Sequence, residues 1–416
     1  MTAYHLRVAD SELEARLLAM GAVLIEGPKA CGKTETASQV AKTVIRLDAD
    51  AAARASVSLD PESLFTGEPP ILFDEWQLEP SIWDQIRRQV DDRRVKGQFI
   101  LTGSARPRDD ANRHSGAGRF ATIQMRPMSL FESGHSSGQI SFAALLDGSP
   151  QPGQGSSLSF QELLNRIVVG GWPELLGASE DLARDWLDDY VSQIVEIDIP
   201  AMGHRRNPTA LMRLLAALGR SVGQAAKLTE LAKDVGGEAG PTAHETITGY
   251  LEALDRLKLL DDSAAWRPHM RSRTRLRTAP VRYFVDPSLG TTALGIGTRE
   301  LRTDPEALGF HFEALVIRDL RIYAQPLRGR VDSWRDANGH EVDAIVSTRG
   351  ERWAAFEVKL NPRDVDSAAA SLLRFAAKVE TLHHGAPACL GVITSSGAGG
   401  RRPDGVDVIP IGALGP

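Results

Sequence analysis

The first part of the chain carries short apolar runs near residues 22 to 26, 43 to 47, 71 to 74 and 98 to 102. Stretches with helical periodicity separate these runs. Strands that alternate with helices usually form a parallel sheet with helices on both faces. Residues 1–132 are therefore expected to form an α/β domain built on a parallel sheet.

The pattern changes after this domain. Residues 133–159 are rich in Gly, Ser, Pro and Gln, and we interpret them as a linker around a short apolar patch, Phe142 to Leu146. From 160 to 300 the apolar residues recur at three- and four-residue intervals, which predicts a helical domain. Residues 301–416, with a helix at Pro305 to Tyr323 and apolar strands after it, are expected to form a third domain of the α/β class.

Within the middle domain the elements follow the order of a winged helix. Helices are predicted at Leu211 to Val222, from Leu228 onward, and at Thr242 to Leu257. The last helix has an apolar face formed by Ile247, Leu251 and Leu254. Its polar face is expected to enter a DNA major groove.

A hairpin-like segment from 267 to 282 follows, and it carries no carboxylate. Side chains alternate along a strand, so the arginines between 271 and 277 would share one face. Such a face suits DNA phosphates without reading sequence. The alternative is that these arginines pair with acidic residues of the first domain. The residues concerned are Arg267, Arg271, Arg273, Arg275, Arg277 and Arg282.

A glycine-rich loop directly follows the first apolar run and has the spacing Gly-x4-Gly-Lys-Thr. In such a loop the glycines let backbone N–H groups surround phosphate oxygens. Lys33 would meet the β- and γ-phosphates, and the Thr34 hydroxyl would hold Mg²⁺. The sequence therefore predicts a site for ATP and Mg²⁺ that is formed by Gly27, Pro28, Lys29, Ala30, Cys31, Gly32, Lys33, Thr34 and Glu35.

Two further runs end in residues that suit ATP hydrolysis. Asp74 is expected to hold Mg²⁺, and Glu75 to polarise the attacking water. Thr102-Gly103-Ser104 would place small hydroxyls near the γ-phosphate. The alternatives are a strand end that meets a solvated helix start and a plain strand-to-turn exit.

A second group of polar residues lies in the last domain. Glu313 is on the predicted helix, Asp343 on one predicted strand, and Glu357 and Lys359 on the next. Asp343 faces Glu357 if the loop between the strands has an odd number of residues, such as 349–351. The two carboxylates would suit Mg²⁺ that acts on a phosphodiester, and Lys359 would stabilise the developing negative charge. The alternative is solvated strand charges.

Composition limits the remaining choices. A chain of 416 residues has room for about three domains. The net charge of −6 excludes a generally basic nucleic-acid coat, so any DNA surface must be local. The two cysteines predict no disulfide framework, and the chain has no long apolar run and no leader pattern. We therefore expect a cytoplasmic protein without a membrane segment.

In their order along the chain these features resemble the prokaryotic AAA-type ATPases that join a P-loop domain to a C-terminal domain of the restriction-endonuclease-like, or PD-(D/E)xK, superfamily. Shared landmarks also include Gly118-Arg119, Arg126 to Glu132 and Gly170 to Glu174. The resemblance covers nearly the whole chain, although residues 104–118 are more polar than the helix of the family. It implies a sensor at Ser104, an arginine finger or sensor at Arg119, and nuclease-like residues Glu313, Asp343, Glu357 and Lys359.

The first expectation is a Mg²⁺-dependent ATPase coupled to DNA binding, with DNA cleavage by the C-terminal domain left open. The alternative is a nucleotide-switched DNA-binding regulator whose nuclease-like domain is inert. A small-molecule kinase uses the same loop, but it is disfavoured because Asp74-Glu75 supplies a hydrolytic base. A homo-oligomer is required if Arg119 acts on the site of a neighbouring subunit.

Overall fold

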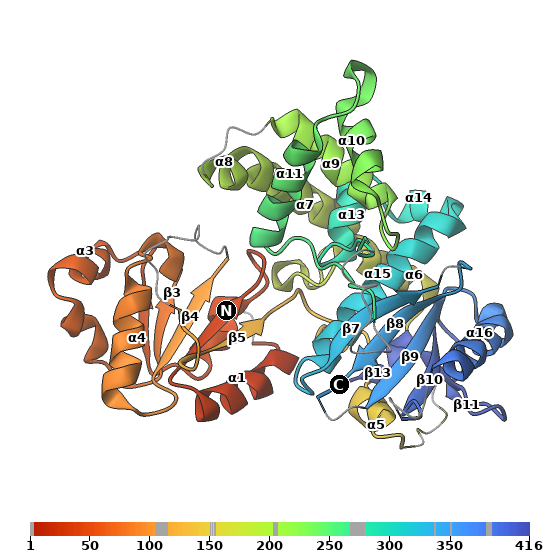
Figure 1. The fold of residues 1–416 in the computed structure, drawn as a ribbon, viewed down its shortest axis with the longest axis horizontal. Coiled ribbons are helices and arrows are strands. Elements are labelled where there is room, and N and C mark those ends of the chain that lie inside the picture. Colours follow the sequence, from red (N-terminus) through yellow and green to blue (C-terminus); the bar gives the residue numbers. More distant parts are fainter. Residues whose placement is uncertain are drawn as a thin grey trace. The chain divides into compact units, whose positions relative to one another are not determined.

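The computed structural model describes residues 4–104, 115–149, 151, 153, 155–202, 207–266, 279–336, 338–349, 352–379 and 385–416. The chain forms two compact units (Figure 1). Unit 1 comprises residues 1–127 with 256–258, and unit 2 comprises 128–255 with 259–416. No helix within the described ranges is both long enough and apolar enough to cross a membrane.

Unit 1 is built on a five-stranded sheet whose strand order is β2-β3-β4-β1-β5. All neighbouring strands are parallel, so their carboxyl ends lie along one edge. This confirms the parallel sheet and the four strands expected from the apolar runs. The strands are β1 (Ala22–Glu26), β2 (Thr43–Arg46), β3 (Ile71–Asp74), β4 (Phe99–Gly103) and β5 (Phe120–Gln124).

Helices cover both faces of this sheet (Figure 1). On one face Ile82 and Ile86 of α4 pack with Phe73 and Phe99, and on the other Leu13 of α1 packs with the opposite side of the strands. The central strands β1, β3 and β4 are buried along their whole length, as expected for strands covered on both faces. The helices are α1 (Val8–Ala19), α2 (Lys33–Ser38), α3 (Ala51–Leu59) and α4 (Ile82–Arg93).

The first part of unit 2 is helical, and the helices expected there are confirmed. A capping box of Ser159 and Glu162 begins α6, and the Asn207 side chain caps α9. After α11, two isolated antiparallel bridges join Leu260 to Phe284 and Ser263 to Val281. The helices are α6 (Phe160–Val169), α7 (Glu180–Gln193), α8 (Ile199–Ala201), α9 (Pro208–Arg220), α10 (Leu228–Gly236), α11 (His244–Arg256), α13 (Pro287–Leu294) and α14 (Thr298–Thr303).

The segment expected to be a linker contains regular structure. Within it β6 (Ile140–Ser141) pairs in parallel with β13 (Leu414–Gly415), and α5 (Phe142–Leu146) is largely buried. The Phe142 ring lies 6.0 Å from the Phe356 ring, measured between centroids. The short apolar patch therefore belongs to the core of the C-terminal sheet, which its distance along the chain could not reveal.

That sheet has six strands in the order β11-β12-β10-β9-β8-β7. Within this sheet the neighbours β7, β8 and β9 are antiparallel, whereas β10 and β12 run parallel to β9. Two long helices, α15 (Pro305–Ala324) and α16 (Val365–Lys378), contact the sheet. The strands are β7 (Arg330–Arg335), β8 (Glu341–Ser347), β9 (Trp353–Lys359), β10 (Cys389–Thr394), β11 (Gly400–Arg401) and β12 (Asp407–Pro410).

A buried ion network ties separate parts of unit 2 together. Arg318 of α15 donates to Asp286 at 2.8 Å and to Asp319 at 2.7 Å. Asp286 also accepts from the Gly171 N–H, and Asp319 accepts from the Leu130 N–H. The two landmark segments 126–132 and 170–174 thus include backbone groups held by buried carboxylates.

Candidate functional site

The phosphate loop begins at the carboxyl end of β1. Ala30 (φ 59°) and Gly32 (φ 98°) adopt left-handed backbone conformations, so the loop curls back on itself. A Cβ at Gly27 would lie 2.5 Å from the backbone oxygen of Met125, and only glycine fits there. Lys29 and Ala30 are exposed at the tip, whereas Cys31 is buried beneath the loop. Glu35 is exposed in the first turn of α2.

Two basic side chains are tied to this loop. The Lys33 ammonium donates to the carbonyl oxygens of Gly27 (3.1 Å) and Pro28 (2.7 Å). Arg7 donates to the carbonyl oxygen of Cys31 at 2.8 Å and holds the loop from outside. Lys33 is therefore positioned within the loop, where the carbonyl bonds can be exchanged for bonds to phosphate oxygens.

Asp74 accepts hydrogen bonds from two other residues at the edge of the sheet that carries the phosphate loop. One of its oxygens, Oδ1, accepts from the Thr34 hydroxyl at 2.8 Å and from the Thr102 hydroxyl at 2.5 Å. Asp74 and Thr102 are buried at the ends of neighbouring strands. Mg²⁺ prefers oxygen ligands such as hydroxyl and carboxylate groups, so the side chains of Thr34 and Asp74 are suitable ligands for the expected ion. Thr102 thus orients the carboxylate.

Glu75 follows Asp74 in a left-handed conformation, with φ 54°. Its carboxylate accepts a hydrogen bond from the side-chain amide of Gln77. Ser104 is buried just beyond β4, on the edge that also carries the phosphate loop. The residues expected for hydrolysis at positions 33, 34, 74, 75 and 104 all belong to this edge.

Arg119 lies at the opposite edge. It precedes β5, and its carbonyl oxygen accepts from the N–H of Ala22, the first residue of β1. The five residues of β1 separate the two edges by about 16 Å. The Arg119 guanidinium pairs instead with Asp91 of α4 at 2.7 Å. A sensor role for Arg119 in its own chain's site is thus contradicted by the sheet direction, and a role in a neighbouring subunit stays a prediction.

The C-terminal domain also gathers the residues expected to act together. The register of β8 and β9 pairs Ala344 with Phe356, and one step further places Asp343 opposite Glu357. The intervening residues are 348–352, an odd number as required, and part of this loop is outside the described ranges. Lys359 donates to Glu357 at 2.7 Å and lies 3.8 Å from an Asp343 oxygen.

Glu313 joins this group from α15. It accepts a hydrogen bond from the phenol of Tyr283. Burial, and next the charge of Asp343, hold the pKa of Glu313 well above its ordinary value. The same two causes raise the pKa of Glu357 to about 7. The group therefore combines closely spaced carboxylates with one ammonium.

Glu357 is bonded on both of its oxygens, because Ser371 of α16 donates to the one that Lys359 does not contact. The Ser371 hydroxyl lies 2.9 Å from Nε2 of His340. In the described part of the chain, no cluster of three or more His, Cys, Asp or Glu side chains has an arrangement that could hold a metal ion. The metal role predicted for Asp343 and Glu357 stays a prediction.

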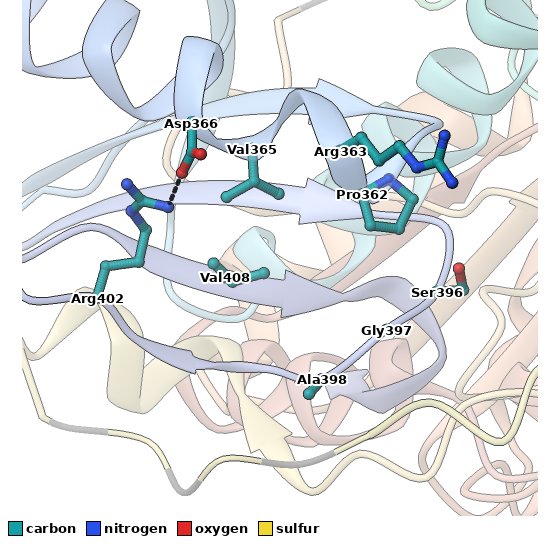
Figure 2. A pocket seen from close by; sticks show the side chains of 9 residues that line it. All are labelled: Pro362, Arg363, Val365, Asp366, Ser396, Gly397, Ala398, Arg402 and Val408. Carbon is teal, nitrogen blue, oxygen red and sulfur yellow. Dashed lines mark hydrogen bonds and ion pairs between the residues drawn. The ribbon is translucent and has the colours of Figure 1, made fainter.

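A hollow of about 340 Å³ lies just past the carboxyl ends of β9 and β10 (Figure 2). Arg363 and Arg402 contribute to its lining. Arg402 forms an ion pair with Asp366 at 2.6 Å, which is drawn as a dashed line in Figure 2. This pairing leaves the Arg402 charge largely compensated.

Two features of the expected DNA surface, the polar face of α11 and Arg282, differ from the sequence prediction. Exposed positions of α11 include Glu245, Glu252 and Asp255, whose charges are repelled by DNA phosphates. The charge of this face therefore argues against its entry into a major groove. Arg282 pairs with Asp262, an acidic residue of its own unit. The other arginines of the expected hairpin, at 267, 271, 273, 275 and 277, lie outside the described residues.

Several site residues escaped the sequence analysis. Gln77 follows the acidic pair by two positions, so its nearness along the chain was an available signal. Arg7 and Tyr283 had no such signal, because they reach the loop and Glu313 only through the fold.

Comparisons with known proteins agree with this geometry. Residues 20–133 match a family model described as "AAA domain". Residues 160–300 and 308–414 match models described as "Domain of unknown function (DUF8612)" and "Domain of unknown function (DUF4143)". The parallel sheet, the phosphate loop and the AAA match define a P-loop ATPase domain of the AAA type, as expected. The restriction-endonuclease-like class of the last domain stays a proposal.

Two relatives with similar sequences are described as uncharacterized, so they assign no activity to this chain. The chain is 25% identical over 358 residues to the uncharacterized protein Rv2008c of Mycobacterium tuberculosis, an alignment that covers 85% of this chain and 73% of that protein. It is 26% identical over 204 residues to an uncharacterized protein of Haemophilus influenzae, an alignment that covers 47% of this chain and 46% of that protein. The Walker-type ATPase paby2304 of Pyrococcus abyssi is 13% identical, with a TM-score of 0.40 and coverage of 68% of this chain and 94% of that one.

Proposed function

We propose that this protein is a Mg²⁺-dependent ATPase whose nucleotide cycle is coupled to DNA held by unit 2. The observation that carries the ATPase part is the convergence of Thr34 and Thr102 on one oxygen of Asp74. Bound Mg²⁺ would neutralise phosphate charge at these oxygens. Lys33 would exchange its two loop carbonyls for phosphate oxygens, and Glu75 would take the proton of the attacking water.

The DNA part rests on the C-terminal domain. The order α15, β7, β8, β9, α16, β10 supports a restriction-endonuclease-like fold, because one face of β8 and β9 carries Asp343, Glu357 and Lys359. Three helices followed by two antiparallel bridges are compatible with a winged helix before it. Arg363, in the hollow next to the end of β9, offers a guanidinium for a phosphate.

A second candidate function is a nucleotide-switched DNA-binding regulator whose nuclease-like domain is inert. Lys359 favours it, because this ammonium contacts both Asp343 and Glu357 and so compensates the carboxylates that would hold a metal ion. Under this alternative the C-terminal group stabilises the fold and cuts nothing.

The experiment measures ATP hydrolysis in Mg²⁺ by the wild type, Lys33→Ala and Lys42→Ala, each without DNA and with double- or single-stranded DNA. Lys42 is an exposed lysine of the same unit and serves as the matched control. We expect Lys33→Ala to lose about 100-fold or more in rate, because an ammonium aimed at the phosphates is removed. Wild-type hydrolysis that DNA leaves unchanged would contradict the coupling, whereas no hydrolysis would contradict the ATPase.

The same DNA, analysed on a gel, separates the two candidates. Cleavage that is lost in Lys359→Ala but kept in Arg374→Ala, an exposed arginine of α16, would support the nuclease. DNA-stimulated hydrolysis with intact DNA would support the regulator. Unchanged cleavage by Lys359→Ala would refute the proposed nuclease site.

A further inference from the structure

The side-chain amide of Gln77 lies next to Glu75, at the edge of the sheet that carries the phosphate loop. Its amide nitrogen donates to the Glu75 carboxylate, whereas its own carbonyl oxygen is buried and has no hydrogen-bond partner among the residues that the structure describes. A buried amide oxygen without a partner destabilises the fold, because it has lost its hydrogen bonds to water. Hydrogen bonds to a charged acceptor are among the stronger ones in proteins, so the bond to Glu75 offsets this cost and fixes the orientation of the amide.

The surrounding backbone is shaped for this side chain. Gly103, the last residue of β4, lies directly against the Gln77 carbonyl oxygen, and a Cβ at position 103 would overlap with it. Gly103 pairs with Glu26 at the carboxyl end of β1, just before the phosphate loop. Gln77 therefore lies between Glu75 and the end of β4, on the edge where hydrolysis is proposed.

We propose that Gln77 is a positioning residue of the hydrolytic site, which holds the Glu75 carboxylate in place to receive the proton of the attacking water. This inference rests on the proposed ATPase function. A glutamate side chain that is free to rotate spends only part of its time in the productive orientation. A displacement of about 1 Å in a reacting group is enough to cost up to 100-fold in rate.

The test uses the full chain and compares three variants. Gln77→Ala removes the amide, Gln77→Glu keeps its size but repels Glu75, and Gly103→Ala crowds the side chain out. We expect kcat to fall about 10- to 100-fold in each. The affinity for the fluorescent, non-hydrolysable analogue mant-AMPPNP should stay within twofold of wild type, because none of the three changes touches Lys33 or the loop.

Gln89→Ala is the matched control. Gln89 of α4 also donates its amide to a carboxylate, that of Glu62 at 3.1 Å, but this pair is exposed and includes neither Glu75 nor a residue of the phosphate loop. We expect wild-type kcat for this variant. The contrast separates the loss of an amide–carboxylate bond as such from the loss of the bond to Glu75.

Each outcome decides the inference. Wild-type or faster turnover by Gln77→Ala or Gln77→Glu overturns it and leaves the ATPase function intact. Loss of mant-AMPPNP affinity in parallel with kcat also overturns it, because a merely structural role would produce that result. Absence of hydrolysis in the wild type instead contradicts the proposed function, and the inference with it.

Discussion

The substitution Arg318→Met tests the buried network of unit 2 most directly. The Arg318 side chain is 2% exposed, and the two carboxylates that it contacts, those of Asp286 and Asp319, are fully buried. Methionine has a similar length but no charge, so the variant leaves Asp286 and Asp319 in the core without their shared cation.

The magnitude follows from the contacts. Arg318 makes three charge-assisted hydrogen bonds, from Nη1 to Asp286 and from Nε and Nη2 to Asp319. Each is worth about 1.5 kcal/mol or more. Protonation of one carboxylate recovers part of the loss, and burial already raises the pKa of Asp319. We expect unit 2 to lose about 3–5 kcal/mol of unfolding free energy, as is usual when one partner of a buried ion pair is removed.

Amide hydrogen exchange gives a local readout at Leu130 and Gly171, whose N–H groups are bonded to these two carboxylates. Both amides should exchange at least 100-fold faster in the variant, since tenfold corresponds to about 1.4 kcal/mol. Arg220→Ala is the control, because Arg220 forms an exposed pair with Asp234 on the same unit. Less than a tenfold change at both amides in Arg318→Met would show that Arg318 does not hold these two carboxylates in place.

Three further outcomes are expected. Burial lowers the pKa of His311 to about 4 from 6.5, so at this residue the unfolded chain binds more protons between these values. The raised pKa of Glu357 acts in the opposite sense over much of this range, so the test compares two proteins. In urea titrations, the unfolding free energy of the wild type minus that of His311→Phe should fall by about 3 kcal/mol as pH drops from 6.5 to 4. Thr102→Val removes a hydrogen bond to Asp74 and should lower kcat about tenfold at saturating Mg²⁺, whereas an unchanged kcat would show that Thr34 alone orients the carboxylate. Arg7→Ala frees the outer side of the phosphate loop and should weaken mant-ADP binding about tenfold in a fluorescence titration; equal affinity would refute a supporting role for Arg7.

Local sequence signals predicted much of the ATPase site. The loop Gly27 to Thr34, the pair Asp74-Glu75 and the segment 102–104 each follow an apolar run directly. Because parallel strands end at one edge, these signals were sufficient to bring the residues together. The same rule explains why Arg119, which directly precedes β5 instead of following a strand, lies at the opposite edge from the phosphate loop; its role in a neighbouring subunit stays a prediction. The strand β5 itself was not recognised from the sequence.

The C-terminal group was predictable in part for a similar reason. Alternation along two strands and an odd loop length place Asp343 opposite Glu357, and both are properties of the chain between 341 and 359. The contribution of Tyr283 depends on a hydrogen bond between residues 30 positions apart. No local pattern encodes such a contact.

Local patterns were enough to predict four strands of the first sheet, the phosphate loop and the acidic residues at strand ends, because periodicity and backbone conformation act over a few residues. Three other features became visible only in the folded chain: the patch Phe142 to Leu146 belongs to a core, Arg318 joins segments around Leu130 and Gly171, and Gln77 donates to Glu75 and lies against Gly103. These contacts depend on burial, which makes unpaired charges and amides costly and so selects their partners by position in space. Distance along the chain carries no information about that choice.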